Sequence, residues 1–265
     1  MRITVKLGGS ILEDSEIRRS LLAQVSRLKA QNHEILLVHG GGKSLSRRLL
    51  QLGLESHFQD GLRVTDGETL GVAVMVLAGE VNKKIVAEMD KLGTAAIGLC
   101  GADGGAIHCL RLSDLPGQPE GLGFVGKPID VNGSFFDLIF GAGLVPVVSS
   151  IALGRDSQLY NVNADQMAAI CASGTGCHSL IYLTDVPGVR DENGAVMSRI
   201  GSHDILAMRS RGTLKGGMLP KTTSCLEALA AGVASVYILP GSSPDILHMF
   251  IKGTLTEGTE IYGDN

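Results

Sequence analysis

Residues 3–10 read ITVKLGGS, an apolar run typical of a buried strand that ends in a lysine and two glycines. Residues 34–42, EILLVHGGG, repeat the arrangement of an apolar run followed by glycines. Each glycine cluster precedes a segment with helical spacing of apolar residues. Glycine lets backbone N–H groups approach an anion closely, and a following helix turns its positive end toward the same point. The chain therefore carries two loops of a kind that holds phosphate.

Short apolar runs alternate with longer amphipathic stretches from one end of the chain to the other. The runs predict strands at residues 3–7, 34–39, 95–99, 145–149, 180–183 and 235–239. Apolar residues recur at helical spacing over residues 17–28 and 45–52, and a third helix over residues 225–230 ends at Gly232. This alternation is typical of a mostly parallel sheet covered by helices on both faces, which predicts the α/β class.

Two segments interrupt the alternation. Residues 103–132 contain glycine, proline and short alternating runs, which predict hairpins that project from the sheet. Residues 154–158 separate a first half rich in glycine loops from a second half that holds Asp165 and Lys221. We expect the boundary between two lobes there, which gives lobes at residues 1–156 and 157–265.

The composition excludes several classes of protein. The chain has 265 residues and a net charge of -4, and its aromatic content is only 4% with no Trp, which argues against a nucleic-acid partner. Its five cysteines show no C-x-x-C spacing and are expected to be free thiols. No leader pattern and no apolar run of about 18 residues is found, so we expect a cytoplasmic protein without a membrane partner.

Two phosphate-site motifs fail on inspection. Gly41-Gly42-Lys43-Ser44 resembles the end of a P-loop, but that motif needs glycine at position 37, where this chain has Leu37. Gly121, Gly123 and Gly126 satisfy G-x-G-x-x-G but have neither a strand before them nor a helix after them. Neither a Walker site nor a dinucleotide site is predicted.

Lys6 is the most informative single position. A lysine at the end of an apolar strand is expensive to bury without an anionic partner, and open α/β sheets bind ligands at the carboxyl ends of their strands. The alternative is a side chain that extends along the sheet and leaves its ammonium group in water. Beside Gly8 and Gly9, phosphate binding is the favoured interpretation.

Several blocks together carry a resemblance to a known family. They are VKLGGS at 5–10, VHGGG at 38–42, GLRVT at 61–65, NVNADQ at 161–166 and GGMLPK at 216–221, with supporting stretches at 98–104, 122–126 and 258–261. In this order and spacing they resemble the amino acid kinase family, and within it the kinases that act on N-acetylglutamate. The resemblance covers essentially the whole chain.

The resemblance implies a role for each matching residue. Lys6 and Lys221 match two lysines that hold the transferring phosphoryl group, one from each lobe, and Asp165 matches an aspartate that orients both. Gly8 and Gly9 match positions facing the phosphates. The acceptor would be bound by Gly41, Gly42, Arg63 and Asn161, with Arg63 on its α-carboxylate. The nucleotide would lie against Asp185, Val186, Pro187, Gly188, Val189, Arg190, Thr213, Leu214 and Lys215.

Three of these residues have simpler interpretations. Arg63 could be a surface residue that forms an ion pair. Its setting favours instead a planar guanidinium group that binds the carboxylate of the substrate. Asp165 also suits the first turn of a helix, and the two roles are compatible. Lys215 is as well placed for solvent as for a phosphate. His39, before the second glycine loop, is expected to pack and to hydrogen-bond within that loop rather than to catalyse.

The implied protein is an ATP-dependent kinase with a three-layer α/β/α sandwich in two lobes. It would phosphorylate the γ-carboxylate of N-acetyl-L-glutamate on the arginine biosynthetic route, using Mg²⁺ held mainly by the nucleotide phosphates, and would form a homodimer. A carboxylate acceptor has a pKa of about 4.3 and needs no general base. Two alternatives stay open: a related kinase for an acylated aminoadipate or a carbamate-type acceptor, and a non-catalytic nucleotide-binding protein of the same fold.

Overall fold

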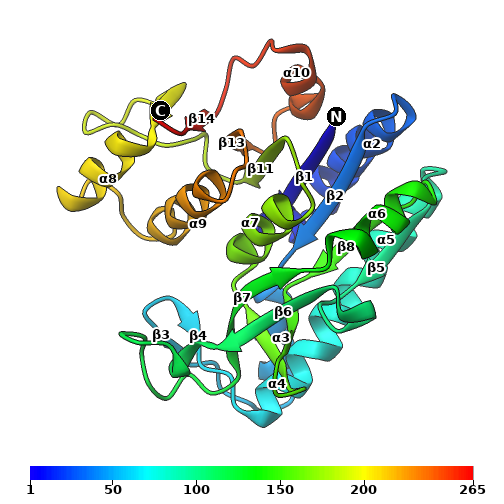
Figure 1. The fold of residues 1–265 in the computed structure, drawn as a ribbon, viewed down its shortest axis with the longest axis vertical. Helices are drawn as coiled ribbons and strands as arrows, with labels where there is room; N and C mark the ends of the chain where they lie inside the picture. Colours follow the sequence, from blue (N-terminus) through cyan, green and yellow to red (C-terminus); the bar gives the residue numbers. More distant parts are fainter. Residues whose placement is uncertain (265) are drawn as a thin grey trace.

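A computed structural model describes residues 1–264, and its centre is an eight-stranded sheet (Figure 1). The strand order is β12-β14-β13-β11-β1-β2-β8-β5, and every pair is parallel except β13 with β14. The strands are β1 (Arg2–Leu7), β2 (Glu34–His39), β5 (Ala96–Leu99), β8 (Val145–Ser149), β11 (Ser179–Thr184), β12 (Arg199–Gly201), β13 (Ser235–Pro240) and β14 (Thr259–Tyr262). The six strands expected from the sequence are confirmed to within one residue at each end.

Helices cover both faces of the sheet. One face is covered by α6 (Gly133–Gly141), α7 (Ala164–Gly174), α8 (Ser202–Ser210) and α9 (Met218–Ala230). The other is covered by α1 (Gly9–Glu13), α2 (Ser15–Ala30), α3 (Gly42–Gln51), α4 (Gly67–Ala73), the π-helix η1 (Val74–Val81), α5 (Asn82–Lys91) and α10 (Ile246–Lys252). The expected three-layer α/β/α architecture is confirmed.

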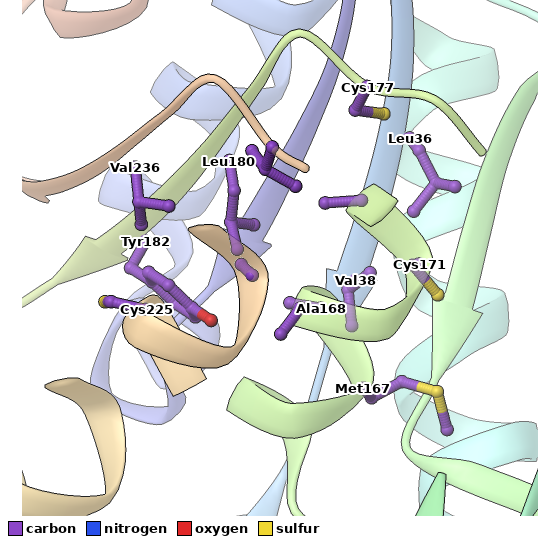
Figure 2. Close-up of a cluster of buried hydrophobic side chains, with 14 of the residues drawn as sticks. Leu36, Val38, Met167, Ala168, Cys171, Cys177, Leu180, Tyr182, Cys225 and Val236 are labelled. Atoms are coloured by element: carbon purple, nitrogen blue, oxygen red, sulfur yellow. The ribbon is translucent and has the colours of Figure 1, made fainter. Parts of the chain in front are cut away.

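Two apolar cores explain why the central strands read as unbroken apolar runs. Leu36 and Val38 of β2 face the core that Figure 2 shows, where they pack with residues of α7, β11 and α9. Ile35 and Leu37 of the same strand face the opposite core. Because successive side chains of a strand point to opposite faces, a strand buried on both sides must be apolar at every position.

The predicted hairpins belong to a small closed barrel. Strands β6 (Ile107–Arg111) and β7 (Val125–Val131) pair antiparallel, and β9 (Ile151–Gly154) and β10 (Leu159–Val162) complete the ring. The short helices η2 (Asp103–Gly105) and η3 (Leu112–Asp114) flank β6, and a further hairpin joins β3 (Phe58–Gln59) to β4 (Leu62–Arg63). The expected lobe boundary at residues 154–158 falls in the turn between β9 and β10, so strands on its two sides pair with each other.

Candidate active site

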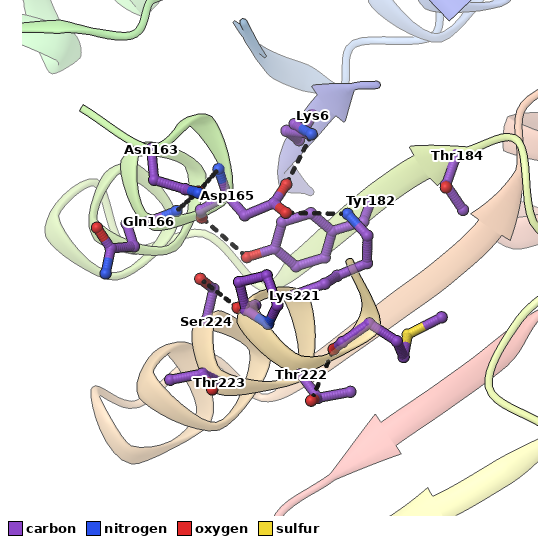
Figure 3. A network of polar contacts seen from close by, with 12 residues as sticks. Lys6, Asn163, Asp165, Gln166, Tyr182, Thr184, Lys221, Thr222, Thr223 and Ser224 are labelled. Carbon is purple, nitrogen blue, oxygen red and sulfur yellow. Dashed lines mark hydrogen bonds and ion pairs between the residues drawn. The ribbon is translucent and has the colours of Figure 1, made fainter. Parts of the chain in front are cut away.

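Lys6, near the carboxyl end of β1, lies together with Asp165 and Lys221 (Figure 3). Lys6 Nζ lies 2.6 Å from Asp165 Oδ1, and Lys221 Nζ lies 3.0 Å from Asp165 Oδ2. Lys6 comes from the end of β1, Asp165 from the first turn of α7 and Lys221 from α9. All three side chains are buried, so the ammonium group of Lys6 does not extend into water.

Local structure fixes the position of the aspartate. The side chain of Asn163 caps α7 and accepts hydrogen bonds from the N–H groups of Asp165 and Gln166. The hydroxyl of Tyr182, which is fully buried in β11, donates to the backbone carbonyl of Asp165 over 3.0 Å. The ring of Tyr182 also lies 5.0 Å from Lys221 Nζ. Asp165 therefore has the expected place in a helix first turn and holds both lysines from it.

The electrostatics of this cluster follow from burial and pairing. Burial alone would raise the pKa of Asp165, but the ammonium groups of Lys6 and Lys221 outweigh it and lower that pKa to about 2. Burial also lowers the pKa of Lys6, and the carboxylate of Asp165 opposes that change. With the carboxylate ionised and both lysines protonated, the cluster carries one net positive charge.

A cavity of about 670 Å³ lies on one side of the cluster. Its lining includes Lys6, Asp165 and Lys221 together with most residues expected at a nucleotide: Gly8, Gly9, Asp185, Val186, Gly188, Arg190, Thr213, Leu214 and Lys215. Pro187 and Val189 do not line it. Val189 is fully buried, and its N–H donates to the hydroxyl of Thr259.

The first glycine loop differs from the expected phosphate cradle at one position. The N–H of Gly8 donates to the carbonyl of Leu183 over 3.0 Å, so it extends the pairing of β1 with β11 and is not free for an anion. A Cβ at Gly8 would lie 2.7 Å from that carbonyl oxygen, which explains the glycine. Gly9 has open space around it and remains accessible from the cavity.

A second cavity, of about 190 Å³, lies near the cluster, next to Asn163 and Ala164. It is lined by Gly41, Gly42, Arg63 and Asn161, which are the residues expected at the acceptor. The two cavities adjoin, because consecutive residues line them: Gly42 and Ala164 face the smaller one, and Lys43 and Asp165 face the larger one. The two lysines and their aspartate line the larger cavity, and Asp165 directly follows a residue that lines the smaller one.

Arg63 presents a buried cation to the smaller cavity. Its guanidinium donates to the hydroxyls of Ser56 and Ser46 and to the carbonyl of Gly42, and it lies 4.6 Å from the centre of the Phe58 ring. These partners are neutral, and no carboxylate within residues 1–264 forms an ion pair with Arg63. Burial lowers the pKa of this guanidinium. The interpretation of Arg63 as a surface ion-pair residue is wrong, and the site suits an anion.

Some cavity residues were missed from the sequence. Ser10, Lys43, Thr184, Gly217, Met218 and Pro220 also line the larger cavity, and Phe58, Leu62, Leu77 and Val125 line the smaller one. Lys43 directly follows the second glycine cluster, and this position could have indicated a phosphate-binding residue. It was considered only as part of the P-loop motif, which was rejected. Within residues 1–264, no three His, Cys, Asp or Glu side chains gather so that they could hold a metal ion.

Comparison with known proteins assigns the family. The profile described as the amino acid kinase family matches residues 1–240. The chain belongs to the amino acid kinase family. It is 43% identical over 261 residues to a protein of Koribacter versatilis named acetylglutamate kinase, covering 98% of each chain. It is 44% identical to the protein of that name from Acidobacterium capsulatum, covering 98% of this chain and 99% of that one.

A solved structure shows the same fold at much lower identity. N-acetylglutamate synthase from Neisseria gonorrhoeae, complexed with coenzyme A and N-acetyl-glutamate, aligns with a TM-score of 0.86 at 20% identity. The alignment covers all of this amino acid kinase chain and 60% of the synthase. No helix within residues 1–264 has the length and apolar character needed to cross a bilayer.

Proposed function

We propose that this chain transfers the γ-phosphoryl group of ATP to the γ-carboxylate of N-acetyl-L-glutamate, giving an acyl phosphate and ADP. One observation carries the proposal: Lys6, Asp165 and Lys221 line the larger cavity, and Ala164, directly before Asp165, lines the smaller one. A phosphoryl donor in the larger cavity and a small acceptor in the smaller one would face each other across the two ammonium groups. The two relatives named acetylglutamate kinase, matched over nearly their whole length, support this acceptor.

The charges of the site suit that reaction. A carboxylate oxygen of the acceptor attacks the γ-phosphorus, and the bond from that phosphorus to the β,γ-bridging oxygen breaks as ADP leaves. The acceptor is already ionised at neutral pH, so no side chain has to remove a proton. Lys6 and Lys221 offset the repulsion between the two anions and stabilise the charge on the transferring group. Arg63 would bind the α-carboxylate and fix the reacting end.

The same site can accommodate Mg²⁺. The metal would neutralise phosphate charge, and it characteristically keeps few protein ligands. Besides Asp165, whose two oxygens are held by lysines, the carboxylate that lines the larger cavity is Asp185. We propose that Mg²⁺ is held mainly by the nucleotide phosphates, with Asp185 in reach.

We also propose that the two halves of the chain bind different substrates. Residues 1–156 would bind the acceptor and form a homodimer, and residues 157–265 would bind ATP, although Gly9 and Asn161 line the cavity assigned to the other half. Light scattering of the purified protein measures the dimer directly, and a monomer at micromolar concentration contradicts it.

Trapping the acyl phosphate with hydroxylamine tests the reaction. The purified protein, ATP and Mg²⁺ are incubated with N-acetyl-L-glutamate, L-glutamate, N-acetyl-L-aspartate, N-acetyl-L-aminoadipate and carbamate. A hydroxamate from the first compound and little from the others supports the proposal. A product from the aminoadipate derivative alone, or ADP formation with carbamate alone, supports the related kinases. ATP binding without any turnover supports a non-catalytic protein.

A further inference from the structure

A buried pair of neutral polar side chains lies directly behind the second glycine loop. His39 ends β2 and is fully buried; its Nδ1 lies 2.8 Å from the carbonyl oxygen of Gly40, and its Nε2 lies 3.0 Å from Nδ2 of Asn82. A carbonyl oxygen can only accept, so Nδ1 must carry the hydrogen. Nε2 is then the acceptor for the amide of Asn82. The two contacts together specify one neutral tautomer of His39.

Asn82 is itself held from several sides. It is fully buried at the junction between the π-helix η1 and α5, and its amide nitrogen also donates to the carbonyl of Val147 in β8 over 2.9 Å. The ammonium group of Lys83 donates to its Oδ1 over 3.1 Å. A Cβ at Gly98 of β5 would lie 1.9 Å from that Oδ1, so the amide packs directly against the sheet. Asn82 thus connects the His39 ring to β5, β8 and α5, and these contacts restrict where the ring can lie.

This arrangement determines where the Gly41 N–H points. The Gly40 carbonyl and the Gly41 N–H belong to one planar trans peptide, in which they point in opposite directions. Because the carbonyl faces the buried ring of His39, the N–H faces away from it. Gly41 lines the smaller cavity, and none of the residues 1–264 accepts a hydrogen bond from its N–H.

The backbone conformation of Gly41 and its close packing restrict the loop to few other conformations. Gly41 has φ of 152°, a conformation that other residues rarely adopt, and a Cβ there would lie 2.8 Å from Cδ2 of Leu77 in the π-helix. The π-helix therefore packs against Gly41, and His39 contacts the carbonyl of Gly40 directly before it. π-helical segments are uncommon and often lie at functional sites.

We infer that His39, held by Asn82, is a positioning residue that aims the Gly41 N–H at the anion shared by the two cavities. This inference rests on the proposed kinase function and adds a residue to it. His39 acts through the backbone of the loop and touches no substrate. Its charge is not involved, since burial lowers the pKa of His39 to about 4 and keeps the ring neutral at pH 7.

Two substitutions at one position separate this role from simple packing. In His39→Asn the side-chain NH₂ can occupy the place of Nδ1 and still donate to the Gly40 carbonyl. In His39→Gln the amide reaches the place of Nε2, next to Asn82, and the donor to Gly40 is lost. We expect kcat for N-acetyl-L-glutamate to fall roughly 10- to 100-fold in His39→Gln relative to His39→Asn. KM for ATP should stay within twofold in both.

The outcomes separate cleanly. Equal kcat in the two variants, or a lower kcat in His39→Asn, overturns the inference, because a side chain that only fills the core would not rank them this way. If His39→Gln does not unfold cooperatively, Asn82→Leu replaces it. That variant removes the donor to Nε2 and leaves the ring free to turn, and it should lower kcat in the same way; an unchanged kcat overturns the inference.

Hydrogen exchange distinguishes a failed inference from a failed kinase assignment. If the wild-type chain makes no hydroxamate, the proposed function fails, and exchange of the peptide covering residues 38–45 still tests the positioning role. We expect faster exchange in His39→Gln than in His39→Asn and the wild type. Equal exchange in all three proteins overturns the role of His39 whatever reaction the chain catalyses.

Discussion

The charge of Lys6 can be removed with little change in the size of the side chain, by the substitution Lys6→Met. Asp165 keeps its contact with Lys221 at 3.0 Å, so no buried charge is left without a partner and the fold should be retained. The net charge of the cluster falls from one to zero. The change therefore tests what the second cation contributes to phosphoryl transfer.

The expected loss can be worked from Coulomb's law. Two unit charges 4 Å apart interact by roughly 4 kcal/mol at an effective dielectric constant of 20. If that attraction is gained in the transition state relative to the enzyme–substrate complex, its loss lowers kcat about 10³-fold. The salt bridge between Lys6 and Asp165 does not offset the loss, because the interaction that matters is with the incoming phosphate.

The assay is the rate of hydroxamate formation at saturating ATP and acceptor, with circular dichroism to show that the variant is folded. Lys252→Met is the matched control, since Lys252 is exposed in the last turn of α10 and far along the chain from every site residue. Lys221→Met should behave like Lys6→Met. A kcat within tenfold of the wild type in either folded variant would refute the two-cation scheme.

Three further predictions address the neighbouring groups. Arg63→Lys loses the planar fork that Ser46 and Ser56 orient, so KM for the acceptor should rise about tenfold or more while KM for ATP is unchanged; an effect on ATP alone contradicts the role of Arg63. Asp165→Asn leaves two buried ammonium groups without their anion and should lower the free energy of unfolding in urea by about 3–5 kcal/mol; an unchanged midpoint is the contrary result. His39 has a folded pKa of about 4, below the usual 6.5, so its stabilising effect is complete above pH 6.5 and declines as the pH falls toward 4. Between pH 7 and pH 4.5 the wild type should therefore lose about 2 kcal/mol more stability than His39→Asn, as measured by urea unfolding at both pH values, and equal losses in the two proteins count against a buried neutral ring.

Most of the central sheet could be predicted from the sequence because strands such as β1, β2, β8 and β11 are buried on both faces. Such a strand is an unbroken apolar run, and polar or glycine residues mark its ends, as in Glu34–His39. The lysine at the end of β1 and the glycines after β1 and β2 could be assigned to a ligand because of their position. They stand at the carboxyl edge of a parallel sheet, where little else explains them.

Features that depend on contacts across the sequence could not be predicted. Residues 74–81 are nearly all apolar, so they show no helical period, and nothing in them indicates a π-helix. The barrel closes through pairs such as Asn161 with Val125, whose register no local pattern specifies. No local pattern around Ser46 or Ser56 indicates that their hydroxyls accept hydrogen bonds from Arg63 in the folded chain. Gly8 was expected to offer its N–H to phosphate, but β11 takes that donor.

The placement of Asp165 resolves a conflict between stability and the proposed chemistry. Two ammonium groups buried together without an anion would repel each other and lose their protons, and a kinase needs them charged. A single carboxylate at 2.6 Å and 3.0 Å pairs with both ammonium groups and offsets only one of their two formal charges. A second carboxylate would cancel that excess and weaken the attraction for phosphate. One aspartate between two lysines therefore gives the buried pair a counter-ion and still leaves one formal positive charge for the proposed phosphoryl group.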